Sequence, residues 1–91
     1  MFEREYNLIC RCVREKKYVM THHALDEMIT DDLHIRDIEN IILNGSIIRS
    51  EQDAKTLEIK YIVYGVSCDG FEAEVVAKIK NQLVIITVYL L

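Results

Sequence analysis

Apolar residues recur every three or four positions in the first half of the chain, and this period predicts helices. The first helix is expected over residues 2–16. Its apolar face holds four residues at helical spacing: Phe2, Tyr6, Ile9 and Val13. A second, short helix is expected over residues 22–29 and a third over residues 35–43. Thr21 is a suitable N-cap for the second helix, because a threonine hydroxyl accepts a hydrogen bond from a free backbone N–H. An Asn-Gly pair after the third helix supplies the left-handed conformation that ends a helix.

Beyond residue 45 the apolar period shortens to two, which predicts strands. Four strands are expected, over residues 46–52, 56–66, 71–80 and 83–91. Asp-Gly and Lys-Asn pairs separate the last three strands and are turn signals, so these strands should form an antiparallel meander. The final strand is apolar on both faces, which is typical of a central strand covered on two sides. Residues 18–20 are expected to form a short extended link.

Helices followed by strands predict the α+β class, with N-terminal helices packed on one face of a curved antiparallel β-sheet. The length of 91 residues indicates a single domain over residues 1–91. A domain of this size buries about 60–65% of its unfolded surface, which is enough for a modest core. Hydrophobic residues make up 51% of the chain and charged residues 29%, a composition typical of a globular protein.

The net charge of −4 disfavours a broad nucleic-acid surface and leaves room only for a local basic patch. The chain has three cysteines, an odd number without the spacing of a disulfide framework, which indicates reduced thiols and a cytoplasmic location. Cys10 and Cys12 lack a second cysteine pair, so their spacing does not predict a zinc site, and no cofactor is expected. No apolar run is long enough to predict a membrane helix or a signal peptide.

Two adjacent histidines, His22 and His23, begin the second predicted helix. His23 shares a helical face with Glu27, four positions later. The plainest interpretation is a polar helix start. General acid–base catalysis ranks next, because the ordinary pKa of histidine suits proton transfer near neutral pH. Metal binding ranks last, since it needs a third ligand and nothing in the spacing makes Asp31, Asp32 or His34 converge on the pair.

Three lysines, Lys60, Lys78 and Lys80, fall on neighbouring predicted strands and are expected to share one sheet face. The favoured interpretation is a solvated face with cross-strand ion pairs. The glutamates interleaved with the lysines are Glu58, Glu72 and Glu74. The functional alternative is that the lysines hold a phosphodiester, since fixed cations stabilise a transition state with added negative charge.

Tyrosines and one threonine complete the candidate chemistry of the strands. Tyr61, Tyr64 and Tyr89 could stack on nucleic-acid bases, although each is more often a packed aromatic in a small core. Thr87 interrupts an apolar strand. Its hydroxyl either forms a local hydrogen bond or lines a site, because burying it without a partner costs stability.

The order of elements and three local motifs resemble a known family. The motifs are "THHALDEM", "DIENIILNG" and "LVIITVY", and the resemblance covers residues 17–89. The chain resembles a small bacterial uncharacterised-domain family of RelE/ParE-like toxins, in the barnase/EndoU/colicin/RelE superfamily, and is more distantly similar to MqsR-type mRNA interferases. The matched positions are Thr21, His23, Ala24, Met28, Asp37, Ile38, Gly45, Thr87 and Tyr89.

The resemblance implies the toxin of a type II toxin–antitoxin system, a metal-independent endoribonuclease that cleaves RNA by general acid–base catalysis. It implies that His23 transfers protons and that Thr87 and Tyr89 reach the same cleft from the sheet. Lys60 and Lys78 are the cations expected to stabilise the phosphorane. Contacts with RNA are expected from Lys55, Lys80 and Tyr61. The implied partners are RNA and a cognate antitoxin, often one with a zinc-ribbon domain. A homodimer through an exposed edge of the final strand is also considered.

The chain departs from the family pattern beside the expected site. Glu27 and Asp31 stand where the family has arginine, and His34 stands where it has serine. Each carboxylate close to the site would weaken phosphate attraction by about 1 kcal/mol or more at surface dielectric. This favours an alternative function, a catalytically inactive RelE-like protein-interaction module.

Overall fold

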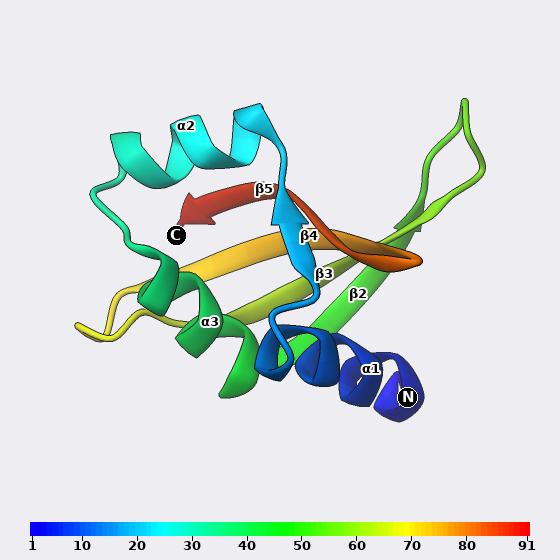
Figure 1. The fold of residues 1–91 in the computed structure, drawn as a ribbon, viewed down its shortest axis with the longest axis horizontal. Coiled ribbons are helices and arrows are strands. Elements are labelled where there is room, and N and C mark those ends of the chain that lie inside the picture. Colours follow the sequence, from blue (N-terminus) through cyan, green and yellow to red (C-terminus); the bar gives the residue numbers. More distant parts are fainter.

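The computed structural model describes residues 1–91, the whole printed sequence, as three helices and five strands (Figure 1). The helices are α1 (Glu3–Arg14), α2 (His22–Thr30) and α3 (Ile35–Leu43). The strands are β1 (Tyr18–Met20), β2 (Ser46–Gln52), β3 (Ile59–Val66), β4 (Glu72–Lys80) and β5 (Gln82–Leu90). The strands form one sheet in the order β1-β5-β4-β3-β2. This confirms the predicted α+β class, all three helices and the meander.

The prediction of a wholly antiparallel sheet is wrong, because the sheet is mixed. β1 pairs in parallel with β5, with Tyr18 opposite Leu83 and Met20 opposite Ile85. The segment expected to be a link becomes a strand because α1, which precedes it, crosses the sheet and returns the chain beside the start of β5 (Figure 1). The four strands from β2 to β5 pair antiparallel, as predicted.

One face of the sheet carries the hydrophobic core. Figure 1 shows α1 and α3 on the same side of the strands. The fully buried side chains on these two helices are Ile9, Val13, Ile38, Ile41 and Ile42, which meet Val63, Val75, Ala77, Leu83, Ile85 and Val88 of the strands. Side chains alternate along a strand, so the neighbouring positions point to the other side. We call that side the open face. It holds Lys60, Ile62, Tyr64, Glu72, Glu74, Val76, Lys78, Thr87 and Tyr89.

The free side of β5 is closed by α2, which lies beside it (Figure 1). Thr21 caps α2 and also ties it to the strand, since its backbone N–H donates to the Ile85 carbonyl at 3.0 Å and its hydroxyl to the Ile86 carbonyl at 3.1 Å. Farther along, the Val88 N–H donates to Oε1 of Glu27 at 3.0 Å. β5 therefore has partners on this side from Leu83 to Val88, and pairing of its remaining end with a partner stays a prediction. No helix is long and apolar enough to cross a bilayer.

Asp37 joins the start of α3 to the loop after β3. Its carboxylate accepts hydrogen bonds from the N–H of His34 at 2.8 Å and of Cys68 at 2.9 Å, and the residue is buried. The His34 hydrogen bond is the main cause that lowers the pKa of the Asp37 carboxyl, and the Cys68 N–H lowers it further. The charged carboxylate therefore stabilises the fold at pH values above its unfolded pKa of about 3.9. This contribution is lost as the pH falls through the lower pKa of the folded state.

We expect Asp37→Asn to lower the free energy of unfolding by about 2 kcal/mol at pH 7, because an amide supplies one acceptor oxygen in place of two charged ones. Below about pH 4 the difference from the wild type should shrink, since the unfolded wild type then binds a proton that the folded state, with its lower Asp37 pKa, does not. Urea unfolding at pH 7 and pH 3 measures both values. Asp69→Asn is the matched control, because Asp69 is exposed and its carboxylate accepts no hydrogen bond. An equal loss at both pH values would contradict the assigned role of the charge.

Candidate functional site

Tyrosine, glutamate and arginine meet in the middle of the open face. The Tyr89 hydroxyl donates to Oε1 of Glu74, and Nη2 of Arg49 lies 3.9 Å from the same oxygen. Tyr89 and Glu74 come together because they are directly opposite in the β4–β5 ladder. The Glu74 carboxylate raises the pKa of Tyr89, with burial as the second cause, so the phenol stays protonated at neutral pH. The face therefore holds a protonated phenol beside a guanidinium.

The guanidinium of Arg49 is held by a second carboxylate. Its Nε donates to Glu51 at 3.1 Å, and this hydrogen bond is the largest cause that raises the pKa of Arg49. About half of the Arg49 side chain is exposed, with a fraction of 48%. The group is therefore a fixed cation that a ligand on the open face can reach. Neither Arg49 nor Glu74 was among the site residues predicted from the sequence.

His23 and Tyr89 open onto one hollow at the edge of this face. The hollow has a volume of about 360 Å³ and lies between α2 and the end of β5. Its lining consists of His23, Asp26, Glu27, Thr30, Asp31, Val88 and Tyr89. Nε2 of His23 lies 3.3 Å from Oε1 of Glu27, one helical turn away, while 68% of the imidazole side chain is exposed. Glu27 thus orients a histidine that solvent or a ligand can contact.

The predicted lysines lie at the other end of the open face. Lys60 and Lys78 line a hollow of about 230 Å³ together with Thr21 and Glu58. Nζ of Lys78 lies 2.7 Å from Glu58, and Nζ of Lys80 lies 3.2 Å from the same carboxylate. Hydrogen bonds from these two lysines lower the pKa of Glu58. Two of the three lysines therefore form the cross-strand pairs that the favoured interpretation describes, while Lys60 forms no ion pair.

A family model matches most of the chain. Residues 20–90 match the domain of unknown function DUF4258. The chain belongs to the DUF4258 family. No curated protein and no solved structure matches it. The match includes α2, α3, β2 to β5 and the last residue of β1, and α1 precedes it. Both hollows and the Tyr89 cluster therefore belong to the DUF4258 domain.

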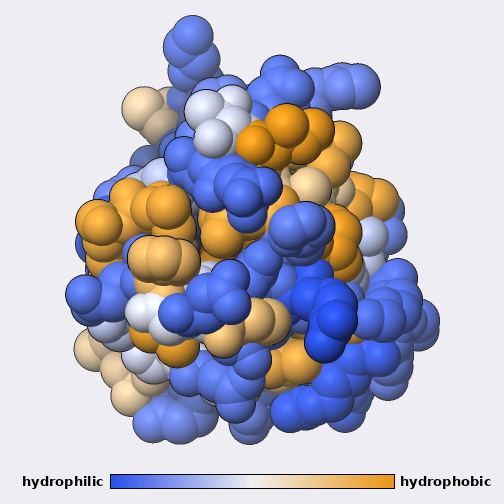
Figure 2. Space-filling view, turned by 90° about the vertical axis from the view of Figure 1, so that its left-hand side faces the viewer, coloured by the Kyte–Doolittle hydropathy of each residue, from blue (hydrophilic) through white to orange (hydrophobic).

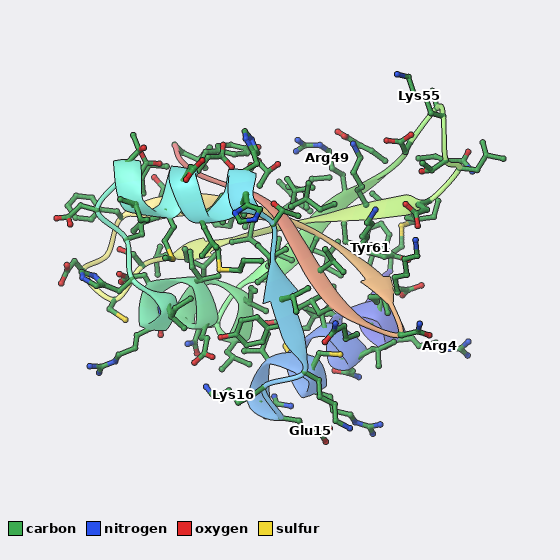
Figure 3. All side chains as sticks on the ribbon, turned by 45° about the horizontal axis from the view of Figure 1, so that its top comes forward. Arg4, Glu15, Lys16, Arg49, Lys55 and Tyr61 are labelled. Atoms are coloured by element: carbon green, nitrogen blue, oxygen red, sulfur yellow. The ribbon has the colours of Figure 1, made fainter.

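The DUF4258 domain does not bring every predicted residue to this site. The Tyr61 ring packs against Phe2 of the α1 N-terminus, with ring centroids 6.3 Å apart in an edge-to-face arrangement. Figure 3 shows Tyr61 and Arg49 on opposite sides of the sheet. Strand alternation already separates Tyr61 from its neighbour Lys60, and the interpretation of Tyr61 as an RNA contact overlooked this.

Lys55 and Thr87 occupy different surroundings. Lys55 lies at the tip of the loop between β2 and β3, which projects from the body of the domain (Figure 3). Thr87 is half-buried on the open face, two positions before Tyr89 and opposite Val76. No group of three or more His, Cys, Asp or Glu side chains is arranged to hold a metal ion. The two hollows and the Tyr89 cluster hold imidazole, phenol, guanidinium, lysine and carboxylate side chains.

Proposed function

We propose that this DUF4258 domain is a RelE/ParE-like toxin that cleaves RNA in the cytoplasm without a metal ion. The observation that carries the proposal is the shared hollow of His23 and Tyr89, next to the guanidinium of Arg49. A proton acceptor, a proton donor and a cation are the three groups that this cleavage needs. The resemblance of residues 17–89 to RelE/ParE-like toxins supports the same activity.

The chemistry requires no nucleophile from the protein. The ribose 2′-oxygen attacks the adjacent phosphorus while a base removes its proton, and the bond from phosphorus to the 5′-oxygen breaks as an acid protonates that oxygen. The products are a 2′,3′-cyclic phosphate and a 5′-hydroxyl. His23 serves as the base. The Tyr89 phenol, kept protonated by Glu74, serves as the donor, and Arg49 stabilises the charge on the phosphorane. Lys60 lines the separate hollow at the other end of the open face and contacts a phosphate farther along the RNA.

Two acids at the site, Glu27 and Glu74, have partners within the protein. Glu27, which stands where the resembled family has arginine, holds both His23 and the Val88 N–H. Glu74 is held by Tyr89 and Arg49. These carboxylates therefore orient the reacting groups, and the repulsion of phosphate comes mainly from Asp26 and Asp31, which also line the hollow.

A labelled single-stranded RNA incubated with the pure protein in EDTA tests the proposal. We expect cleavage products with 2′,3′-cyclic phosphate ends, because no metal-bound water takes part, and phosphatase and kinase treatment identifies those ends. Expression in bacteria should arrest growth, and a protein encoded beside the gene should relieve the arrest as its antitoxin. Intact RNA in this assay, together with normal growth, would contradict the endoribonuclease proposal.

A second function, a catalytically inactive interaction module, is favoured by a different observation. Four apolar side chains are exposed near the end of the domain where α2, the β3–β4 turn and the C-terminus meet: Ile29, Phe71, Leu90 and Leu91. Figure 2 shows hydrophobic surface on this end, divided into patches by hydrophilic residues. Exposed apolar patches with a polar rim are typical of protein-binding sites. Intact RNA, with binding of the neighbouring gene product, would favour this function.

A further inference from the structure

The two edges of the sheet differ in how many of their backbone groups have partners. Beside β5, β1 and the start and side of α2 supply partners for the backbone between Leu83 and Val88. At the opposite side β2 is the outermost strand, and only β3 pairs with it. Every residue from Ile48 to Gln52 is exposed. A strand edge of this kind is a template for pairing with another strand.

The direction of the free backbone groups follows from one hydrogen bond. The Asp53 N–H donates to the Glu58 carbonyl at 2.8 Å, so the backbone groups of Asp53 point toward β3. Backbone groups alternate in direction along an antiparallel strand, so those of Glu51 and Arg49 also point toward β3. The N–H and C=O groups of Ser50 and Gln52 therefore point outward, away from the sheet.

Two opposite charges flank Ser50 on β2. Arg49 precedes it and Glu51 follows it, and both side chains lie on the open face, where they form an ion pair at 3.1 Å. If β2 pairs antiparallel with β2 of a second copy, with Ser50 opposite Ser50, each Arg49 lies opposite Glu51 of the other copy. Such a pair has no hydrogen bond between the two residues, and its Cα atoms are only about 4.5 Å apart. The β2 edge of one copy is thus complementary in charge to the β2 edge of a second copy.

We propose that two copies of this chain associate through β2, around a two-fold axis at Ser50, to form one continuous sheet. The two Ser50 residues exchange N–H to O=C hydrogen bonds, and two Arg49–Glu51 pairs flank them on the open face. The same patch serves on both copies, as a two-fold interface requires. The register of β2 shifts between Ile47 and Arg49, which limits the pairing to the short stretch from Ile48 to Gln52. The dimer should therefore be weak and concentration-dependent.

The dimer connects with the candidate site through Arg49. In the paired state Glu51 of the second copy competes for the guanidinium that lies beside Glu74 and Tyr89. The geometry of the edge carries this inference whether or not the domain cleaves RNA. The oligomeric state is therefore measured on the pure protein, without any activity assay.

Sedimentation velocity over a range of concentrations tests the proposal. We expect the mass of the wild type to rise from 10.6 kDa toward twice that value. Ser50→Pro should stay at the monomer mass, because proline removes an outward N–H that the monomer does not use. Ser50→Ala is the matched control and should behave as the wild type, since it keeps the N–H. Circular dichroism checks that both variants fold.

Charge reversal gives an independent test that does not depend on proline. R49E alone places like charges opposite each other across the axis, and so does E51R, so each variant alone should be monomeric. An equimolar mixture of the two should form dimers, because the opposite charges then face each other, and the double variant R49E/E51R should form dimers by itself. A monomeric wild type at every concentration, or a dimer that persists in Ser50→Pro, would overturn the proposal. Pairing of β2 with a segment of another protein would then be the remaining use of the edge.

Discussion

Replacing Gly65 with alanine is expected to lower the free energy of unfolding by about 3 kcal/mol. Gly65 lies in β3 directly beneath α3, where a Cβ atom would stand 2.2 Å from the carbonyl oxygen of Ile41 and 2.9 Å from its carbonyl carbon. Both neighbours are backbone atoms, so no side-chain rotation relieves the contact. α3 must move away from the sheet, and this separates Ile38 and Ile42 from the core that they fill.

Urea unfolding of Gly65→Ala against the wild type measures this loss. Gly70→Ala, in the turn between β3 and β4, is the control. A Cβ at Gly70 meets no atom within 4 Å, but the residue has a φ of 87°, so alanine there costs about 1 kcal/mol of backbone strain alone. A loss at Gly65 no larger than the loss at Gly70 would mean that α3 does not pack against β3 as described.

Most of the fold was predictable because its signals are local. The 3.6-residue period places Ile38, Ile41 and Ile42 on one side of α3, and the structure buries all three. Thr21 was recognised as a cap, and its hydroxyl accepts the Ala24 N–H at 3.1 Å. β1 could not be predicted in this way. It is three residues long, and its partner in the sheet begins more than sixty positions later, at Leu83.

The candidate site was predictable where its geometry is local and was missed where a bulge decides it. The contact of His23 with Glu27 follows from their helical spacing. The contact of Glu74 with Tyr89 does not follow from the turn at Asn81. Counting back from the Lys80–Gln82 pair places Glu74 opposite Val88, but a register shift between Val76 and Ala77 moves the pairing by one residue. Because a shift of one residue changes the sheet face, the Tyr89 cluster depends on this bulge.

Arg49 was missed for a similar reason. The register of β2 against β3 also shifts just before this residue, between Ile47 and Arg49. The sequence shows only one arginine in a short strand, beside a glutamate two positions later. Its approach to Glu74, two strands away, depends on the assembled sheet. The cation of the proposed site therefore became visible only in three dimensions.

If His23 is the base of the proposed cleavage, His23→Ala should lower the rate of RNA cleavage by about 10²–10⁴-fold. The fold should tolerate the change, because 68% of the side chain is exposed and its ion-pair partner is the Glu27 carboxylate on the same helix. The rate is measured on the same labelled RNA in EDTA. Loss of the base should also relieve growth arrest in cells that express the variant.

His22→Ala is the matched control, since it removes an exposed histidine that is adjacent in the chain but does not line the hollow. Adjacent residues on a helix point about 100° apart, so the two imidazoles cannot serve one reacting atom equally. We expect His22→Ala to keep the wild-type rate, and Tyr89→Phe to lose cleavage while it keeps its ring packing. Equal rates for His23→Ala and His22→Ala would exclude His23 as the base. Cleavage would then depend on Tyr89 and Arg49, which meet at Glu74 beside the same hollow.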